Sequence, residues 1–230
     1  MKDFLYVKNN YEALLEEIEK ISSRTGVPAP KLLPVTKSGS DEELLALFGY
    51  GATALGENRP GELKRRAELL ADAGFSPQLH QIGTLQSNKA KLVCDKVSLI
   101  HSLDSLSLAK EIDRQGKRLG RRIPVLIEIN SAEEEQKGGI LPSDAERFYE
   151  AVSAYDSIEI SGLMTMGPVC ESPEEIRRYF RLTKKLFDKL GSIYGFGPTP
   201  VLSMGMTDSI SVAIEEGSTM LRVGRKLFQK

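Results

Sequence analysis

One lysine near the start of the chain follows an apolar segment and precedes a helix signal. Apolar residues 32–35 lead to Lys37, and Ser40 and Glu43 have the spacing of a capping box. We therefore expect a strand that ends at Lys37, opposite a helix N-terminus. An ammonium held there loses hydration unless it is paired, which favours the uncharged amine, and such an amine attacks aldehydes to form Schiff bases. The alternative, a solvated lysine that only follows a strand, is the more common case.

Two glycine-containing segments near the end of the chain could hold a phosphate group. They are residues 203–207, Ser-Met-Gly-Met-Thr, and residues 224–226, Gly-Arg-Lys. Each offers small residues and backbone N–H groups before an expected helix or turn, which suits a phosphate dianion. The alternative is that the glycines only permit tight turns.

Arg222 is the residue near the end of the chain that most needs a partner. It lies at the end of the last expected strand, on the same side as Gly224. An arginine that points into a protein interior needs an anionic or lone-pair partner, which could be a ligand or an internal carboxylate, Glu57 or Glu128. Asn58 closes an earlier strand, where its amide could bind a ligand or, more commonly, cap the following helix.

Lys37, Arg222 and a phosphate-binding loop together suit an aldehyde that carries a phosphate. Pyridoxal phosphate fits best, with the lysine as Schiff-base partner and the arginine facing the pyridine nitrogen. An arginine there keeps the ring nitrogen unprotonated, so the ring is a weaker electron sink and carbanion chemistry is less favoured. His80 is expected instead to be a hydrogen-bonded core residue.

The elements that must position these residues alternate regularly along the chain. The sequence predicts strands over residues 32–37, 52–56, 79–83, 97–101, 123–130, 158–164, 201–203 and 219–223. It predicts helices over residues 3–24, 41–48, 60–70, from 86, from 104 or 105 to 119, 143–155, from 173 through 190, and 208–216, with Ser143 and Glu146 capping the helix 143–155.

Eight strand–helix units in 230 residues indicate an α/β fold, a single (β/α)8 barrel over residues 1–230. A doubly wound open sheet is the alternative. Because little chain follows the eighth strand, the additional N-terminal helix could take the place of the last outer helix. In such barrels the site lies at the carboxyl ends of the strands, and phosphate often binds after strands seven and eight.

The composition argues against several kinds of binding partner and against a secreted or metal-binding protein. The 31 basic and 32 acidic residues nearly cancel, without the basic run that nucleic acid or an anionic membrane would need. No apolar run approaches the ~20 residues that span a bilayer, and the first residues, 1–4, lack the apolar core of a signal peptide. Two distant cysteines and two histidines argue against a disulfide framework or a metal centre. We expect a cytoplasmic protein, and nothing in the sequence requires more than a monomer.

Six motifs, spread over nearly the whole chain, carry a family resemblance: Val35-Thr36-Lys37, Gly56-Glu57-Asn58, residues 80–89 (His-Gln-Ile-Gly-Thr-Leu-Gln-Ser-Asn-Lys), Gly162-Leu163-Met164, residues 202–207 (Leu-Ser-Met-Gly-Met-Thr) and Leu221-Arg222-Val223-Gly224. Together they resemble the pyridoxal phosphate homeostasis protein family, which is related to the N-terminal barrel domain of alanine racemase. The chain departs from the family at Thr207 and Ser209 and in its last residues, 227–230.

The resemblance implies how pyridoxal phosphate would be bound. Lys37 would form the Schiff base, Asn58 would contact the cofactor, and Arg222 would face the pyridine nitrogen. The phosphate would be held by Ser203, Thr207 and the backbone at Met204 and Gly224, and the ring would pack near Met164 and Met166.

The expected function is a non-catalytic carrier that binds pyridoxal phosphate reversibly and passes it to apo-enzymes or amino-acid acceptors. The sequence offers a lysine anchor and a phosphate cup but no evident second acid–base group. An amino-acid racemase or decarboxylase is the alternative, although racemisation needs a base on each face and, with Met166 at the end of strand six, only Lys37 is found. The racemase with this barrel also needs a second domain, for which no residues remain. A Schiff-base aldolase acting on a sugar phosphate is the third possibility.

Overall fold

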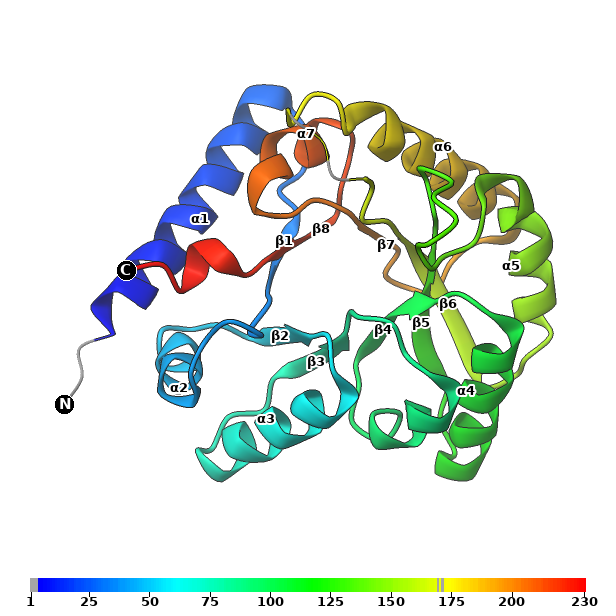
Figure 1. Cartoon of the computed structure of the whole chain (residues 1–230), viewed down its shortest axis with the longest axis horizontal. Coiled ribbons are helices and arrows are strands. Elements are labelled where there is room, and N and C mark those ends of the chain that lie inside the picture. Colours follow the sequence, from blue (N-terminus) through cyan, green and yellow to red (C-terminus); the bar gives the residue numbers. More distant parts are fainter. Residues whose placement is uncertain (1–3, 169, 171) are drawn as a thin grey trace.

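Eight parallel strands form a nearly closed barrel in the computed structural model, which describes residues 4–168, 170 and 172–230 (Figure 1). The strands are β1 (Lys31–Pro34), β2 (Ala54–Glu57), β3 (Gln78–Gln81), β4 (Leu99–Leu103), β5 (Ile123–Glu128), β6 (Ile158–Met164), β7 (Val201–Ser203) and β8 (Met220–Val223). Their order in the sheet is β1-β8-β7-β6-β5-β4-β3-β2. The expected barrel is confirmed, and the open-sheet alternative is wrong.

Helices cover the outside of this barrel (Figure 1). The α-helices are α1 (Leu5–Thr25), α2 (Asp41–Gly49), α3 (Pro60–Asp72), α4 (Leu106–Leu119), α5 (Ala145–Ser153), α6 (Arg177–Tyr194) and α7 (Ile210–Glu215), and the 3-10 turns are η1 (Ser87–Leu92), η2 (Pro142–Asp144), η3 (Thr207–Ser209) and η4 (Arg225–Leu227). Within the described ranges, no helix has both the length and the apolar character needed to cross a bilayer.

The barrel closes through a short seam between β1 and β2. Just past the end of β1, Val35 forms an isolated parallel bridge with Gly56 of β2, and the Thr36 N–H donates to the Gly56 carbonyl at 3.2 Å. The Thr36 hydroxyl also donates to Glu57 Oε1 at 2.5 Å. Lys37 is therefore the first residue past the seam, at the carboxyl end of the strands.

The N-terminal helix α1 takes the place of the last outer helix, as expected. It packs against α7 on one side and α2 on the other, and Figure 1 shows it beside the C-terminus. The Asn10 amide donates to the carbonyls of Leu227 and Gln229, at 3.2 and 2.8 Å. Asp3, the first residue of the expected helix, lies outside the described residues.

Two helix caps follow the sequence signals. Ser40 and Glu43 form the expected capping box of α2, with Glu43 N–H to Ser40 Oγ at 3.2 Å and Ser40 N–H to Glu43 Oε2 at 2.6 Å. Ser105, rather than Asp104, caps α4, since its hydroxyl accepts from the Leu108 N–H at 3.4 Å.

Three helix predictions need correction. Ser143 does not cap a helix, because Pro142 starts a 3-10 turn that runs directly into α5 at Ala145 without an extended capping residue. The helix expected from residue 86 is the 3-10 turn η1, and α6 begins at Arg177 rather than near residue 173.

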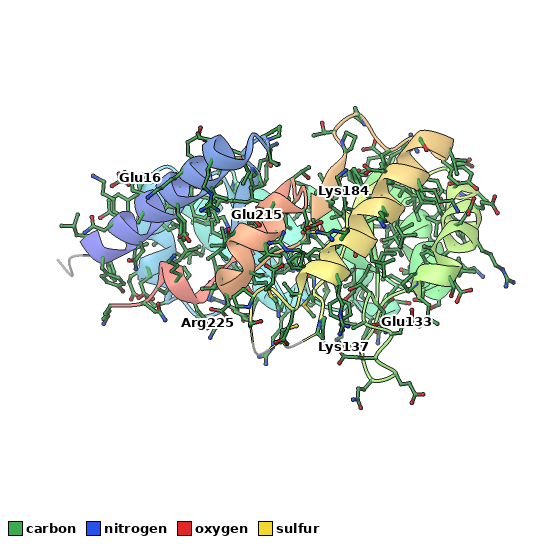
Figure 2. The ribbon with its side chains drawn as sticks, turned by 90° about the horizontal axis from the view of Figure 1, so that it is seen from above. Glu16, Glu133, Lys137, Lys184, Glu215 and Arg225 are labelled. Atoms are coloured by element: carbon green, nitrogen blue, oxygen red, sulfur yellow. The ribbon has the colours of Figure 1, made fainter. Side chains whose placement is uncertain are left out.

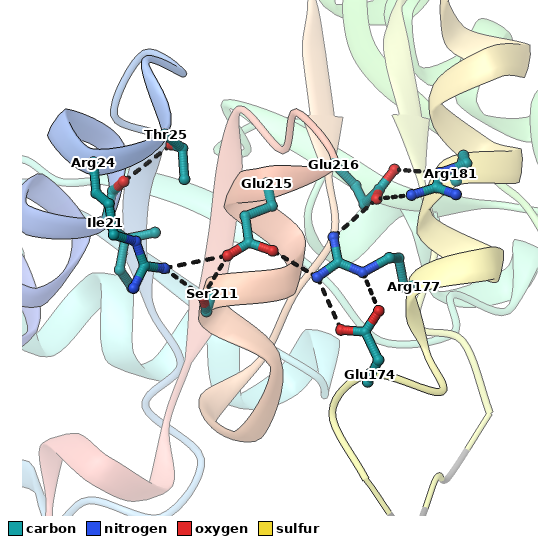
Figure 3. Close-up of polar contacts among 9 residues, drawn as sticks. All are labelled: Ile21, Arg24, Thr25, Glu174, Arg177, Arg181, Ser211, Glu215 and Glu216. Atoms are coloured by element: carbon teal, nitrogen blue, oxygen red, sulfur yellow. Dashed lines mark hydrogen bonds and ion pairs between the residues drawn. The ribbon is translucent and has the colours of Figure 1, made fainter.

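Charged side chains join α6, α7 and α1 on the outside of the barrel (Figure 3). Arg177 contacts Glu174, Glu215 and Glu216, and its contacts with the last two are 2.5 and 3.0 Å long. Arg181 also reaches Glu216, at 2.7 Å, and Arg24 of α1 reaches Glu215, at 3.2 Å. Exposed pairs are individually weak, so this network links the three helices to one another but contributes little stability pair by pair.

Strand residues alternate between two apolar regions. Those that face the helices, such as Ile100, Ile127 and Leu163, belong to the main core, whereas Leu99, Leu126 and Met164 form a separate cluster. Because successive strand residues point to opposite faces, this cluster lies inside the barrel. The apolar interior supports the polar residues at the carboxyl mouth.

Gly162 of β6 has no room for a side chain. Its φ is +145°, and a Cβ there would lie 2.0 Å from the carbonyl oxygen of Val201 on β7. We expect Gly162→Ala to lower the free energy of unfolding by at least about 2 kcal/mol, measured by urea denaturation. Gly61→Ala in α3, where a Cβ would meet no atom within 4 Å, is the control and should change stability by less than about 1 kcal/mol. Equal effects of the two substitutions would contradict this packing.

Candidate functional site

A cavity of about 420 Å³ lies at the carboxyl mouth of the barrel. Its walls come from the segments that follow β1, β2, β3, β6, β7 and β8, together with Glu128 at the end of β5 and Arg222 within β8. Figure 2 shows Arg225, which lines it, along the same side of the molecule as Lys137 from the loop after β5. The volume is in the range of small-molecule sites.

Six of the nine residues expected to bind a cofactor line this cavity: Lys37, Asn58, Met166, Thr207, Arg222 and Gly224. The structure thus brings together residues separated by up to 187 positions of sequence. The remaining three, Met164, Ser203 and Met204, do not line it.

Arg222 is a buried cation on the cavity wall. Its side chain donates to Ser203 Oγ at 2.6 Å and to the Thr165 carbonyl at 2.9 Å, yet only 4% of the residue is exposed. Burial lowers the pKa of its guanidinium to about 10, opposed by the charge of Glu128. No carboxylate in the described part of the chain lies within ion-pair distance, so the proposed pairs with Glu57 and Glu128 do not form. The guanidinium remains a strong donor toward the cavity.

A chain of hydrogen bonds inside the barrel holds Arg222 in place. Ser203 Oγ lies 3.1 Å from His101 Nδ1, and His101 Nε2 lies 2.9 Å from His80 Nδ1. Because the guanidinium can only donate hydrogen bonds, Ser203 Oγ accepts one from Arg222. The Ser203 hydroxyl can therefore donate its own hydrogen bond to His101 Nδ1. Burial lowers the pKa of His80 to about 4 and that of His101 well below its usual value, so both rings stay neutral. The prediction that His80 is a hydrogen-bonded core residue is confirmed.

Lys37 differs from expectation in its surroundings. The residue is exposed, so the loss of hydration predicted for its ammonium is not seen. Its backbone is nevertheless well fixed, because the buried guanidinium of Arg66 donates to the carbonyls of Thr36 and Gly39, at 2.6 and 2.9 Å. Arg66 Nη1 also lies 3.3 Å from Glu57 Oε1. The seam therefore fixes the backbone on both sides of Lys37, and its side chain lies along the cavity.

Asn58 and Gly224 flank Lys37 on the two sides of the seam. The α3 helix begins without a side-chain cap, so the capping role considered for Asn58 is wrong, and its side chain lines the cavity. A Cβ at Gly224 would lie 2.9 Å from the Val35 carbonyl oxygen, so only glycine allows β8 to approach β1 this closely.

Ser203 and Met164 lie on the inner face of the barrel, whereas Met204 belongs to the core between the strands and the helices. The Ser203 hydroxyl is engaged by Arg222 and His101, and the Met204 N–H donates to the Met220 carbonyl at 3.2 Å. Met164 is buried in the cluster inside the barrel. The Ser203 hydroxyl and the Met204 N–H are therefore already hydrogen-bonded within the protein.

Glu128 is a site residue whose chemistry the sequence reasoning missed. It ends β5, lines the cavity and is 8% exposed. Burial, and to a lesser extent the charge of Asp104, raise the pKa of its carboxyl to about 7, and the charge of Arg222 opposes this. From the sequence, Glu128 was expected only as a possible ion-pair partner of Arg222. The signal that could have identified it is its position as the acidic residue at the end of an otherwise apolar strand.

The arrangement fits an aldehyde that carries an anionic group. An amine on one wall can bond to the carbonyl carbon, and the buried guanidinium can donate to a ring nitrogen or an oxygen. Among the described residues, no group of three histidine, cysteine or acidic side chains could hold a metal ion.

The unpaired state of Glu128 can be tested without any ligand. Its raised pKa means that the folded chain holds the proton more tightly than the unfolded chain, so this carboxyl destabilises the fold as the pH rises from 4.5 to about 7. We expect Glu128→Gln to be about 3 kcal/mol more stable than the parent chain above pH 7, and the difference to vanish below pH 4.5. Denaturation curves across this pH range measure it, with exposed Glu133→Gln as the control. A difference that does not change with pH would show that the fold leaves the pKa of Glu128 at its ordinary value, and a parent chain that becomes the more stable of the two above pH 4.5 would show that Glu128 is paired.

Comparison with known proteins agrees with this geometry. Residues 10–229 match the family model described as the N-terminal domain of alanine racemase. A pyridoxal phosphate homeostasis protein of Aquifex aeolicus is 39% identical over 217 residues, covering 94% of both chains. Another, from Helicobacter pylori, is 35% identical over 228 residues, covering 97% of this chain and 98% of the relative.

A solved structure has the same fold over almost the whole chain. PipY of Synechococcus elongatus, solved with pyridoxal phosphate (PLP) bound, superposes with a TM-score of 0.84 at 26% identity, covering 97% of this chain and 100% of that one. The chain belongs to the pyridoxal phosphate homeostasis protein family, on the barrel of the alanine racemase N-terminal domain.

Proposed function

We propose that this protein binds pyridoxal 5'-phosphate as a Schiff base on Lys37, buffers its free concentration and delivers it to acceptors. The names of the Aquifex and Helicobacter relatives and the ligand of PipY support this reading. The observation that carries it is the buried, donor-only guanidinium of Arg222 on the same cavity as the Lys37 amine.

Each wall of the cavity has a role in this proposal. The aldehyde of the bound cofactor supplies an electrophilic carbon for the lysine amine. Arg222, still a cation at neutral pH, donates to the pyridine nitrogen and keeps it unprotonated. Thr207 and Gly224 lie after β7 and β8, where a phosphate would be held, and Asn58 and Met166, on the same cavity, would border the ring.

Three of the expected contacts take a supporting role. Ser203 orients Arg222 through its hydroxyl, Met164 packs inside the barrel, and Met204 packs in the core between the strands and the helices. The ring and the phosphate then contact residues above this layer. The cofactor is held between a covalent anchor and a fixed donor, which suits retention and release rather than turnover.

The cellular setting completes the proposal. Both cysteines are free, consistent with the reducing cytosol. We place the protein there as a single-domain monomer over residues 1–230 that exchanges the cofactor with apo forms of PLP-dependent enzymes.

The second candidate function is an amino-acid racemase or decarboxylase, because Glu128 also lies on the cavity wall. Glu128 is a second group able to exchange protons at the cavity, beside Lys37. Racemisation requires a base on each face of the substrate, so this pair has to be tested directly.

The colour of the protein tests the cofactor assignment. We expect the chain, mixed with PLP, to show a visible Schiff-base absorption band that Lys37→Ala abolishes. Lys31→Ala, at the opposite end of β1, should keep it. Borohydride reduction and mass spectrometry should locate the pyridoxyl group on Lys37. A colourless parent protein, or modification of another lysine, would refute the assignment.

Turnover assays separate the carrier from the enzyme. Incubated with pyridoxal phosphate and L-alanine or other L-amino acids, the loaded protein should form neither the D-isomer nor carbon dioxide above the level given by free cofactor. Multiple turnovers that depend on Lys37 and Glu128 would establish the enzymatic alternative instead.

A further inference from the structure

A second, smaller cavity of about 230 Å³ adjoins the first. Thr84, Glu128 and Met166 line both, and the segment 129–132, Lys137, Gly138 and Gly167 form the rest of the smaller one. The two spaces therefore meet at Glu128. The smaller cavity is too narrow for a folded chain segment with its side chains, but a small organic molecule fits.

Glu128 is the unsatisfied charged group of this smaller cavity. The other charged side chain on its wall, Lys137, is paired with Glu134 at 2.8 Å and donates to the Gly167 carbonyl at 3.2 Å. The Asn130 amide is hydrogen-bonded to the Glu134 backbone and the Ser131 hydroxyl to Thr165. The Glu128 carboxyl has no ion pair or hydrogen bond to any side chain that the structure describes.

A buried carboxylate without a partner suits a cationic ligand that can give up a proton. The cavity volume restricts that ligand to a small molecule, and the Thr84 hydroxyl at the junction offers a further hydrogen bond. A primary ammonium has this chemistry. It is also the group to which a carrier would pass the aldehyde.

We propose that the smaller cavity receives a small primary amine, and that Glu128 takes a proton from it so that its nitrogen can displace Lys37 from the bound aldehyde carbon. This inference rests on the function proposed above. It assigns the acid–base group that the sequence did not reveal.

The exchange balances without an oxidant or an additional reactant. The incoming ammonium loses one proton to Glu128, and its nitrogen forms a bond to the aldehyde carbon. The carbon–nitrogen bond to Lys37 breaks, and the Lys37 nitrogen receives the two remaining protons of the incoming nitrogen and the proton held by Glu128. Glu128 ends as a carboxylate, Lys37 as an ammonium, and the aldehyde carbon is bonded to the new amine.

Several charged groups around the two cavities bear on the charge of Glu128. Asp104 raises the pKa of its carboxyl and Arg222 lowers it. Lys37 lines the larger cavity and Lys137 the smaller one, and Asp208 and Arg225 at the rim pair with each other. With a pKa of about 7, Glu128 changes from acid to carboxylate near neutral pH.

The test is the rate at which glycine removes the aldehyde from Lys37 of loaded protein, followed by mass spectrometry of the pyridoxyl group that borohydride fixes on Lys37 in samples taken over time, and normalised to the fraction loaded. We expect the rate to rise through about pH 7, and Glu128→Gln to slow it about 100-fold and remove that step. Asp104→Asn should move the step to lower pH. Glu133→Gln, an exposed acid on the loop after β5 (Figure 2), is the control and should leave rate and profile unchanged.

A second measurement needs no cofactor. The carboxyl carbon of Glu128, followed by NMR in unloaded protein, should titrate near pH 7, and Asp104→Asn should lower that midpoint. The assignment falls if Glu128→Gln transfers at the parent rate with the same pH step, or if Asp104→Asn leaves both midpoints in place. Either result would leave the cofactor assignment intact, whereas a parent protein that never becomes coloured would refute the proposed function itself.

Discussion

The buried contact between Glu57 and Arg66 holds the seam on which the site depends. Arg66 reaches Glu57 at 3.3 Å and binds the carbonyls of Thr36 and Gly39. A buried pair gives little net stability, but loss of one member leaves an uncompensated charge and costs about 3–5 kcal/mol. The pair therefore specifies one arrangement of β1 and β2, and Lys37 emerges from a backbone that is fixed on both sides.

A second constraint operates inside the barrel, where Arg222 has been taken out of water. Ser203 and the Thr165 carbonyl satisfy part of its donor capacity, and the neutral pair His101 and His80 extends the chain of hydrogen bonds. The guanidinium is thus presented in one orientation before any ligand arrives. This preorganisation lets a small cavity hold a cofactor firmly with few direct contacts.

Much of the fold was predictable because it depends on local patterns. Apolar runs gave all eight strands, and the Ser40–Glu43 spacing gave the α2 cap. Errors arose where neighbours overrule local signals. Ser143 has the right spacing for a cap, but Pro142 begins a 3-10 turn that leaves no extended residue there. For the site, the sequence identified several residues that line the cavity. It could not show that Thr207 lines the cavity whereas the Ser203 hydroxyl is hydrogen-bonded to Arg222, because the direction of each side chain depends on the tertiary structure.

The sequence by itself determined the alternation of strands and helices, the balance of charge, and the lysine, arginine and glycine positions at strand ends, since each is a property of residue type and spacing. Only the tertiary structure decided that Lys37 is exposed and that the Glu128 carboxyl has no side-chain partner among the described residues. Hydration and pairing depend on which strands meet at the barrel mouth. Residues far apart in the chain create those surroundings, so no local pattern could have revealed them.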